Sequence, residues 1–468
     1  MSLYTATYTD LYQLSMAQVY FKKDRHSQQA VFDYYFRKNP FNGGYTIFAG
    51  LENVLDSLKE FRFTEEDLDY LKTQNFDASF LEYLKDFRFR GSIFSVLEGD
   101  VVFPNQPILR VEASLIEAQL IETFLLNMLN FQSLIATKAC RMRYIAKDRT
   151  LLDFGLRRAH GPGGYYASRA AFIGGFNGTS NVLAGKNFGL PISGTMAHSF
   201  IQSYGDELQA FRDFAEHRPK NCVLLVDTYN TLKSGVPNAI TVAKEMEVRG
   251  QRLLAIRLDS GDLAYFAKQS RKLLDEAGLD YVQIAASNQL DEYVIKSLQE
   301  QQAPIDIYGV GTNLVIGKPD AALGGVYKLA FYDGKPRIKI SENIAKITMP
   351  HAKQVYRLKN DKGEWVGSDA IGLTSEGSFE VMEHPFEVYK SMRLTGLQRE
   401  ALLQPVMEKG ERSFATKTLQ EIADYREKRF AQLPTEYKRF NNPHHYKVGI
   451  SEQLKEERDR LIKLHKSL

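Results

Sequence analysis

The stretch that decides the fold runs from Leu151 to Phe200 and reads LLDFGLRRAHGPGGYYASRAAFIGGFNGTSNVLAGKNFGLPISGTMAHSF. Glycines, hydroxyls and amides crowd it, with a pair of arginines near its start and a histidine near its end. Three short runs of apolar or small residues each stop at a polar cluster: DFGLRR at 153–158, GTSN at 178–181 and GTMAHS at 194–199. This pattern predicts several strand ends that converge on one polar pocket able to accept phosphate.

Outward from this stretch, strand-like runs alternate with helix-like runs, which is typical of repeated βα units and a parallel sheet. About seven such strands favour an α/β fold with a closed or nearly closed (β/α) barrel over an open sheet. The predicted strands are Leu151–Asp153, a short run before Gly178, Pro191–Gly194, Val223–Val226, Leu253–Leu258, Val282–Ala286 and Ile305–Tyr308. The predicted helices are Ser168–Gly174, Asp206–His217, Thr231–Arg249, Asp262–Ala277 and Leu290–Gln301.

The regions on either side of this barrel have a different texture. Residues 1–140 mix helical patterns with strands joined by short turns, which predicts an α+β domain with antiparallel strands. Residues 325–396 are strand-like again, so we expect them to complete that domain around the barrel at 141–324. The last segment, 397–468, is charged and predicted to be mostly helical.

Composition excludes some classes of function. The 468 residues carry 60 Lys and Arg against 57 Asp and Glu, a net charge of +3, which is too balanced to indicate nucleic-acid or membrane binding. The apolar segment 114–136 contains Glu117 and Glu122, so it is not predicted to span a membrane. Two cysteines in apolar surroundings, Cys140 and Cys222, favour buried free thiols in a reducing cytoplasm, and no signal peptide is evident.

The sequence Gly309-Val-Gly311-Thr312-Asn follows the last predicted strand of the barrel. Glycines allow backbone amides to approach an anion, and Thr312 adds a hydroxyl donor. Barrels often bind phosphate at this position, although an ordinary turn gives the same pattern.

Arg257 and Asp259 lie two residues apart after another predicted strand, so their side chains face the same way. Arg257 could bind an anionic group while Asp259 contacts ribose hydroxyls, a metal or a developing positive charge. The alternative is a simple ion pair followed by a helix cap at Ser260 or Asp262.

His198 lies in a loop of small residues after a strand, between Thr195 and Ser199. A lone histidine is more often structural, but hydroxyl neighbours favour a nucleophilic or acid–base role here. No Cys/His spacing indicates zinc, and no GxxxxGK[ST] motif is present, so any ATP is not bound by a P-loop. On residue type alone, the aromatic side chains of Tyr12 and Phe154 are interpreted as core.

Seven motifs stand out when the chain is taken in order: TDLYQLSM, DFGLRRAHGPGGYYASR, FNGTSNVLAG, GTMAHSF, LVDTYNT, RLDSGDL and GVGTNL. Taken together, they resemble the nicotinate phosphoribosyltransferase family. The resemblance runs from Thr9 to beyond Gly317 and resumes at Asn442-Pro443-His444.

The resemblance implies an irregular α/β barrel joined to a discontinuous sandwich domain, and a homodimer with active sites at the subunit interface. It also implies the conversion of nicotinate and phosphoribosyl pyrophosphate to nicotinate mononucleotide and pyrophosphate, in NAD biosynthesis. Mg²⁺ is the implied cofactor, its ligands being unassigned, and ATP is the implied co-substrate. ATP hydrolysis would proceed through phosphorylated His198.

Further roles carry over from the matching motifs. Phe154 would stack on the pyridine ring, and Tyr12 of a second subunit would cover the other face. Arg157, Thr195 and Arg257 would hold the nicotinate carboxylate or nearby phosphate, and Asp259 would support the ribosyl transition state or Mg²⁺. The ribose 5-phosphate would be held by Gly309, Gly311 and Thr312.

One position bears on the choice between acid and amide. Related nicotinamide-using enzymes have an aspartate where this chain has Ser180, and a carboxylate there would repel nicotinate. Ser180 therefore favours the acid. The alternatives are a nicotinamide phosphoribosyltransferase and a non-catalytic barrel that senses phosphoribosyl compounds; the presence of His198, Arg257 and Asp259 argues against the latter.

Overall fold

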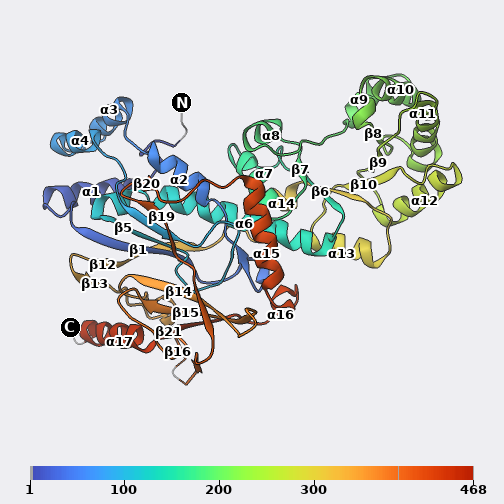
Figure 1. Cartoon of the computed structure of the whole chain (residues 1–468). Helices are drawn as coiled ribbons and strands as arrows, with labels where there is room; N and C mark the ends of the chain where they lie inside the picture. The colour runs from blue at the N-terminus through green and yellow to red at the C-terminus, as the bar shows by residue number, and fades with distance from the viewer. Residues whose placement is uncertain (1–3, 388, 467–468) are drawn as a thin grey trace. The chain divides into compact units, whose positions relative to one another are not determined.

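The structure is a computed structural model that describes residues 4–387 and 389–466. The chain forms two compact units, which Figure 1 colours along the chain. Unit 1 comprises Met1–Leu134 and Ala322–Leu468, and unit 2 comprises Ile135–Ala321. The first boundary falls inside the helix α6 (Glu122–Ala146).

Unit 2 is built on a sheet of six parallel strands in the order β7-β6-β11-β10-β9-β8. The strands are short and mostly buried, as expected where helices cover a parallel sheet. Their bounds are β6 (Thr150–Asp153), β7 (Gly178–Thr179), β8 (Val223–Leu225), β9 (Ala255–Leu258), β10 (Gln283–Ser287) and β11 (Ile307–Val310).

The first and last of these strands pair directly, since Leu152 of β6 lies opposite Gly309 of β11. The seventh predicted strand, Pro191–Gly194, is reduced to a single parallel bridge between Ile192 and Thr179. These four residues are exposed, so burial does not extend the pairing. Among the described residues, no ladder joins this segment to β8, the other end of the sheet.

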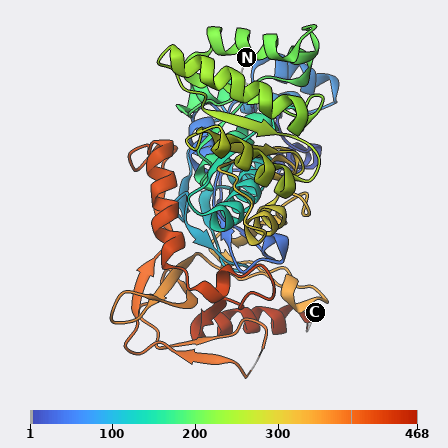
Figure 2. The ribbon, with the colours of Figure 1, turned by 90° about the vertical axis from the view of Figure 1, so that its right-hand side faces the viewer.

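Helices follow most strands of unit 2, and Figure 2 shows them gathered around the sheet. Aspartates begin several of them: the side chains of Asp206, Asp262 and Asp291 each accept a backbone N–H in the first turn. The helices are α7 (Gly163–Ile173), α8 (Val182–Phe188), α9 (His198–Gln202), α10 (Glu207–His217), α11 (Val236–Val248), α12 (Leu263–Glu276), α13 (Glu292–Glu300) and α14 (Thr312–Val315), with a π-turn at Thr231–Gly235.

Unit 1 contains two larger sheets. The first has the order β13-β12-β1-β5-β3-β19-β20. In it, β1 pairs with β12 in antiparallel fashion, with Tyr34 opposite Tyr327. The strand that follows unit 2 therefore returns to the N-terminal strands, as expected. The strands are β1 (Gln29–Phe36), β3 (Ser92–Ser95), β5 (Leu109–Ser114), β12 (Gly325–Tyr332), β13 (Lys335–Pro336), β19 (Gln404–Glu408) and β20 (Glu411–Arg412).

The second sheet of unit 1 is mixed and has the order β17-β16-β21-β15-β14-β18. Its strands are β14 (Lys353–Lys359), β15 (Trp365–Leu373), β16 (Val381–Glu383), β17 (Ser391–Arg393), β18 (Gln398–Ala401) and β21 (Lys447–Ser451). The unit also contains the pair β2 (Thr46–Ile47) and β4 (Val101–Val102), with α1 (Leu11–Lys22), α2 (Leu51–Lys59), α3 (Glu65–Thr73), α4 (Ala78–Lys85) and α5 (Leu115–Leu120).

The segment 397–468 differs from the expected helical tail. It contains α15 (Leu419–Gln432), α16 (Thr435–Lys438) and α17 (Glu452–Lys466), but also the strands β18, β19, β20 and β21. These strands have at most five residues and pair with distant partners, such as β14 and β3. Runs that short carry little periodic signal in the sequence, so tertiary pairing decides their structure.

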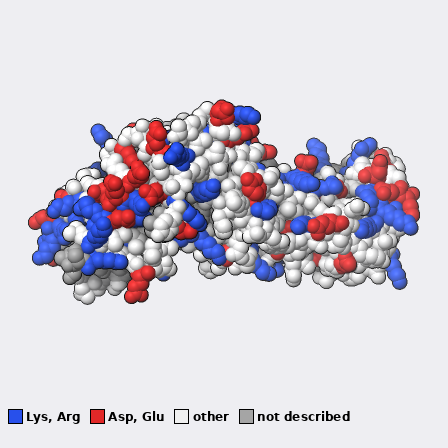
Figure 3. Space-filling model, turned by 90° about the horizontal axis from the view of Figure 1, so that it is seen from below, with Lys and Arg blue, Asp and Glu red and all other residues white. Residues whose placement is uncertain are grey.

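The surface agrees with the balanced composition. Lys and Arg are interspersed with Asp and Glu on the face shown in Figure 3. Cys140 and Cys222 are both buried, and burial raises the pKa of the Cys222 thiol to about 12. Within residues 4–387 and 389–466, no helix is long and apolar enough to cross a membrane.

Candidate active site

Polar side chains gather in unit 2 where its strands end. Asp153 ends β6, while Arg257 and Asp259 lie at the end of β9 and just beyond it. Ser287 ends β10, and Gly311 follows β11. Because the carboxyl ends of parallel strands share one edge of the sheet, these residues come together although they are far apart in sequence.

The turn after β6 is held by a buried carboxylate. Asp153 accepts hydrogen bonds from the Gly155 amide (2.8 Å) and from the hydroxyls of Ser168 (2.7 Å) and Thr179 (2.8 Å). Burial raises the pKa of Asp153, and the three hydrogen bonds oppose that rise. Asp153 therefore ties the turn that carries Phe154 to both α7 and β7.

The Phe154 ring lies against the last strand of the sheet. The backbone N–H of Phe154 donates to the Val310 carbonyl (2.8 Å). A Cβ added to Gly309 would lie 2.4 Å from the Phe154 ring. The Arg257 guanidinium lies 5.9 Å from the centre of the ring. Gly309 is thus required for the packing of Phe154, in addition to its predicted contact with phosphate.

After β11 the chain turns at once into the short helix α14. Asn313 fixes this turn by donating to the carbonyls of Gln289 and Leu290, both at 3.1 Å. Thr312 is exposed at the first position of the helix, directly after Gly311. The hydroxyl of Thr312 is therefore accessible to a ligand.

Arg257 is held on two sides by groups of the candidate site. It donates to the Thr195 hydroxyl (2.6 Å) and to the Met196 carbonyl (3.2 Å), and it pairs with Asp259 at 3.2 Å. The ion pair weighed as an alternative is therefore present, and Asp262 caps α12. Arg257 also donates to the Thr195 hydroxyl, a contact that a simple Arg257–Asp259 ion pair does not require.

His198, the first residue of α9, has a partner at each ring nitrogen. Its Nδ1 lies 3.0 Å from the Thr228 hydroxyl, and its Nε2 lies 3.7 Å from a carboxylate oxygen of Asp259. About a third of the His198 side chain is exposed (38%), so the ring is oriented yet accessible. Thr228 belongs to the LVDTYNT motif, but the sequence analysis did not select it for the site.

Asp227 is a second residue that the sequence interpretation did not select. Its Oδ2 accepts from the Asp259 amide (2.8 Å) and the Ser260 hydroxyl (2.7 Å). Its Oδ1 is buried without a hydrogen-bond partner among the described residues. The sequence signal that could have identified Asp227 as a site residue is a carboxylate shortly after the strand β8. The unpartnered oxygen makes Asp227 a candidate ligand for a cation.

The remaining predicted residues are less tightly placed. Ser180 is half-buried, and its amide donates to the Asp153 carbonyl at 2.8 Å. Arg157 is exposed, three residues beyond Phe154 in the turn after β6. Tyr12 lies on α1 in unit 1 with 51% of its surface exposed.

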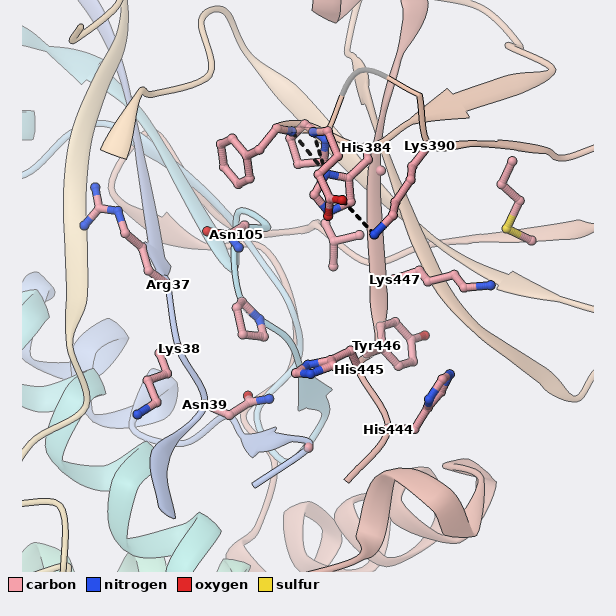
Figure 4. A pocket seen from close by; sticks show the side chains of 18 of the residues that line it. Arg37, Lys38, Asn39, Asn105, His384, Lys390, His444, His445, Tyr446 and Lys447 are labelled. Atoms are coloured by element: carbon pink, nitrogen blue, oxygen red, sulfur yellow. Dashed lines mark hydrogen bonds and ion pairs between the residues drawn. The ribbon is translucent and has the colours of Figure 1, made fainter. Parts of the chain in front are cut away.

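Unit 1 has a cavity of its own, with a volume of ≈ 1190 Å³, shown in Figure 4. None of its lining residues is a predicted site residue. Lys390 in its wall is paired with Glu387 at 2.7 Å, and Lys38 and Lys447 lie on opposite sides of the view. Its cations therefore do not converge on one point as a built anion site requires.

A parallel α/β sheet with an arginine, a carboxylate and an accessible imidazole at its carboxyl edge is an arrangement suited to binding an anionic small molecule. Sequence models of three parts of one family match almost the whole chain. They describe the nicotinate phosphoribosyltransferase N-terminal domain (residues 7–130), the nicotinate phosphoribosyltransferase family (150–362) and its C-terminal domain (352–458). The chain belongs to the nicotinate phosphoribosyltransferase family.

Individual relatives agree with this assignment. Nicotinate phosphoribosyltransferase from Bacillus subtilis is 46% identical over 457 residues, covering 95% of this chain and 92% of the relative. The protein of that name from Dictyostelium discoideum is 40% identical over 511 residues, covering 96% and 87%. The crystal structure of human nicotinic acid phosphoribosyltransferase superimposes with a TM-score of 0.86 at 30% identity, covering 97% of this chain and 99% of the human chain.

Proposed function

We propose that the protein transfers phosphoribosyl from 5-phosphoribosyl 1-pyrophosphate to nicotinate, coupled to ATP hydrolysis. The products are nicotinate mononucleotide and pyrophosphate, which places the reaction in NAD biosynthesis. The observation that carries the proposal is the contact of Arg257, Asp259 and His198 at one sheet edge, in a chain that the family matches nearly end to end.

The nicotinate half of the site combines a flat wall with cationic and hydroxyl groups. Phe154 presents a ring fixed by Gly309, and Arg257 with Thr195 lies beside it. A planar anionic base is suited to an aromatic face and to an arginine that orients its carboxylate. Arg157 adds a second cation, and Tyr12 of a second subunit covers the other face of the base in a homodimer.

The phosphoribosyl half must stabilise two developing charges. Breaking the anomeric C–O bond leaves an anionic pyrophosphate and makes the sugar resemble an oxocarbenium ion. Asp259 is a fixed carboxylate that stabilises the positive charge on the sugar. Gly311 and Thr312 begin a helix beside Gly309, a setting in which amides and a hydroxyl bind the 5-phosphate.

The donor set fits Mg²⁺ bound mainly through substrate phosphates. Within the described residues, no group of three or more His, Cys, Asp or Glu side chains could hold a metal ion. Mg²⁺ commonly takes only one or two protein carboxylates, together with water and phosphate. The unpartnered Oδ1 of Asp227 and the carboxylate of Asp259 would hold it, and the ion would neutralise the leaving pyrophosphate.

ATP coupling is assigned to His198. Nδ1 of its imidazole faces the Thr228 hydroxyl, and Asp259 lies beside Nε2, so the ring is held for transfer of the terminal phosphoryl group of ATP to a ring nitrogen. Release of ADP leaves a phosphohistidine, whose later hydrolysis returns the free imidazole and phosphate.

We also propose a finer description of the architecture: an irregular barrel, open between Ile192 and β8, joined to a sandwich domain. The protein is proposed to act in the cytoplasm.

The proposal is tested by incubating the purified protein with phosphoribosyl pyrophosphate, Mg²⁺ and ATP, and with either nicotinate or nicotinamide. We expect nicotinate mononucleotide, pyrophosphate and ADP from the first reaction and far less product from the second. Preferential use of nicotinamide would support the alternative transferase. Formation of no mononucleotide from either base would instead support a phosphoribosyl sensor.

The Ser180→Asp variant is expected to weaken the use of nicotinate. A carboxylate at this position would repel the carboxylate of the substrate, and an added buried or half-buried charge of like sign costs about 1–3 kcal/mol, so the KM for nicotinate should rise roughly tenfold or more. Steady-state kinetics with nicotinate measure the effect. Ser180→Asn is the control of matched size, and equal kinetics for the two variants would remove Ser180 as a determinant of specificity.

A further inference from the structure

The hydroxyl of Ser287 lies between the two charged side chains of the candidate site. Ser287 is the last residue of β10 and only 4% of its surface is exposed. It accepts a hydrogen bond from Nε of Arg257 at 3.0 Å, and it is hydrogen-bonded to Oδ1 of Asp259. One buried hydroxyl therefore contacts both members of the ion pair.

The direction of these hydrogen bonds follows from chemistry alone. A guanidinium only donates and an ionised carboxylate only accepts, whereas a serine hydroxyl has one proton and two lone pairs. The single proton of Ser287 must therefore point to Asp259, and a lone pair must accept from Arg257. The other acceptor within reach, the Leu258 carbonyl, is uncharged and farther away at 3.4 Å, so it competes poorly.

This arrangement divides the two oxygens of Asp259 between different tasks. Oδ1 is occupied by Ser287 and by Nη2 of Arg257, whereas Oδ2 faces Nε2 of His198 at 3.7 Å. The plane of Arg257 is fixed at the same time, because its Nε contacts Ser287 and its Nη1 contacts Thr195. Losing the hydroxyl would remove one restraint from each of the two side chains, while Arg257 would keep its contacts with Thr195 and Asp259.

The sheet explains why this residue can act in this way. β10 and β9 are parallel neighbours in which Ala285 lies opposite Arg257 and Ala286 lies opposite Leu258. One residue further along, Asp259 lies beyond the end of β9, while Ser287 still pairs with Gly309 of β11. The serine is therefore placed by backbone pairing, which makes it a rigid support for side chains that must not move.

We propose that Ser287 is a positioning residue for the transfer reaction: it sets the orientation of Arg257 toward the base and of Asp259 toward the sugar and His198. The proposal rests on the proposed function. Because Ser287 is almost fully buried, its effect passes through the two charged groups that it contacts.

The kinetic test compares Ser287→Ala with Ser270→Ala. Ser270 is a matched control, because it is also buried in unit 2 and its hydroxyl has no hydrogen-bond partner among the described residues. In Ser287→Ala we expect kcat/KM for nicotinate to fall about ten- to a hundredfold, the range for losing a buried hydrogen bond to a charged group. The KM for nicotinate should rise as well, which loss of active protein through misfolding would not cause.

A second measurement does not depend on turnover or on the variant's folding. In the unmodified protein, the Nε–H proton of Arg257 is expected to exchange slowly with water. Its signal is identified in ¹⁵N–¹H spectra by its absence from the spectrum of Arg257→Lys. Rapid exchange, or a folded Ser287→Ala with the kinetics of Ser270→Ala, would overturn the positioning role. If the unmodified protein makes no mononucleotide, the proposed function fails while the exchange result still reports on the contact.

Discussion

Replacing His198 with alanine is expected to abolish the labelling of the protein by ATP. Incubation of the unmodified protein with ATP labelled in its terminal phosphate should give an acid-labile phosphoprotein, because a phosphohistidine hydrolyses in acid. The His198 ring is accessible and is held between Thr228 and Asp259. Without the imidazole there is no nucleophile at this position, so the label should be absent and mononucleotide formation should no longer respond to ATP.

The control for this experiment is His217→Ala. His217 is exposed at the last position of α10 and makes no contact with the group around Arg257. It should retain both the label and the response to ATP. Label persisting in His198→Ala would place the phosphorylated residue elsewhere in the chain.

Asp259→Asn is expected to lower kcat by about 10²–10³-fold, the usual cost of removing one preorganised electrostatic group from an active site. The amide keeps the shape of the side chain but not its charge, so it cannot offset the positive charge on the ribosyl group. The substitution also removes the ionic partner of Arg257. This loss is costly because the Arg257 side chain is only 15% exposed and water cannot fully replace the carboxylate. Initial rates at saturating nicotinate and phosphoribosyl pyrophosphate measure kcat directly.

Asp280→Asn provides a comparison for this substitution. Asp280 is exposed in unit 2 and lies outside the candidate site, so its loss of charge should leave kcat unchanged. If Asp259→Asn turned over at the same rate as Asp280→Asn, the carboxylate would have no role in stabilising the transition state.

Much of unit 2 could be predicted from the sequence, because its signals are local. Apolar runs bounded by glycine and polar residues predicted β6, β9, β10 and β11, and helical patterns between them predicted helices such as α12 and α13. The run Pro191–Gly194 was wrong as a strand, because its residues are exposed and only Ile192 pairs. Short strands in 397–468 escaped prediction because they have at most five residues and their pairing is decided by the tertiary structure, as for β19, which pairs with β3 near the start of the chain.

For the site, the sequence by itself determined which chemistries are present: His198, Arg257, Asp259 and the glycines around Thr312 all follow predicted strands. Only the tertiary structure decided how they are combined. Ser287 meets Asp259 because β9 and β10 are neighbours in the sheet, although the two residues are 28 positions apart. Thr228, beyond β8, meets His198 at the start of α9, 30 positions earlier in the chain. A hydroxyl has no pattern of its own in a sequence, and its role depends on which charged groups the neighbouring strands bring within hydrogen-bond distance.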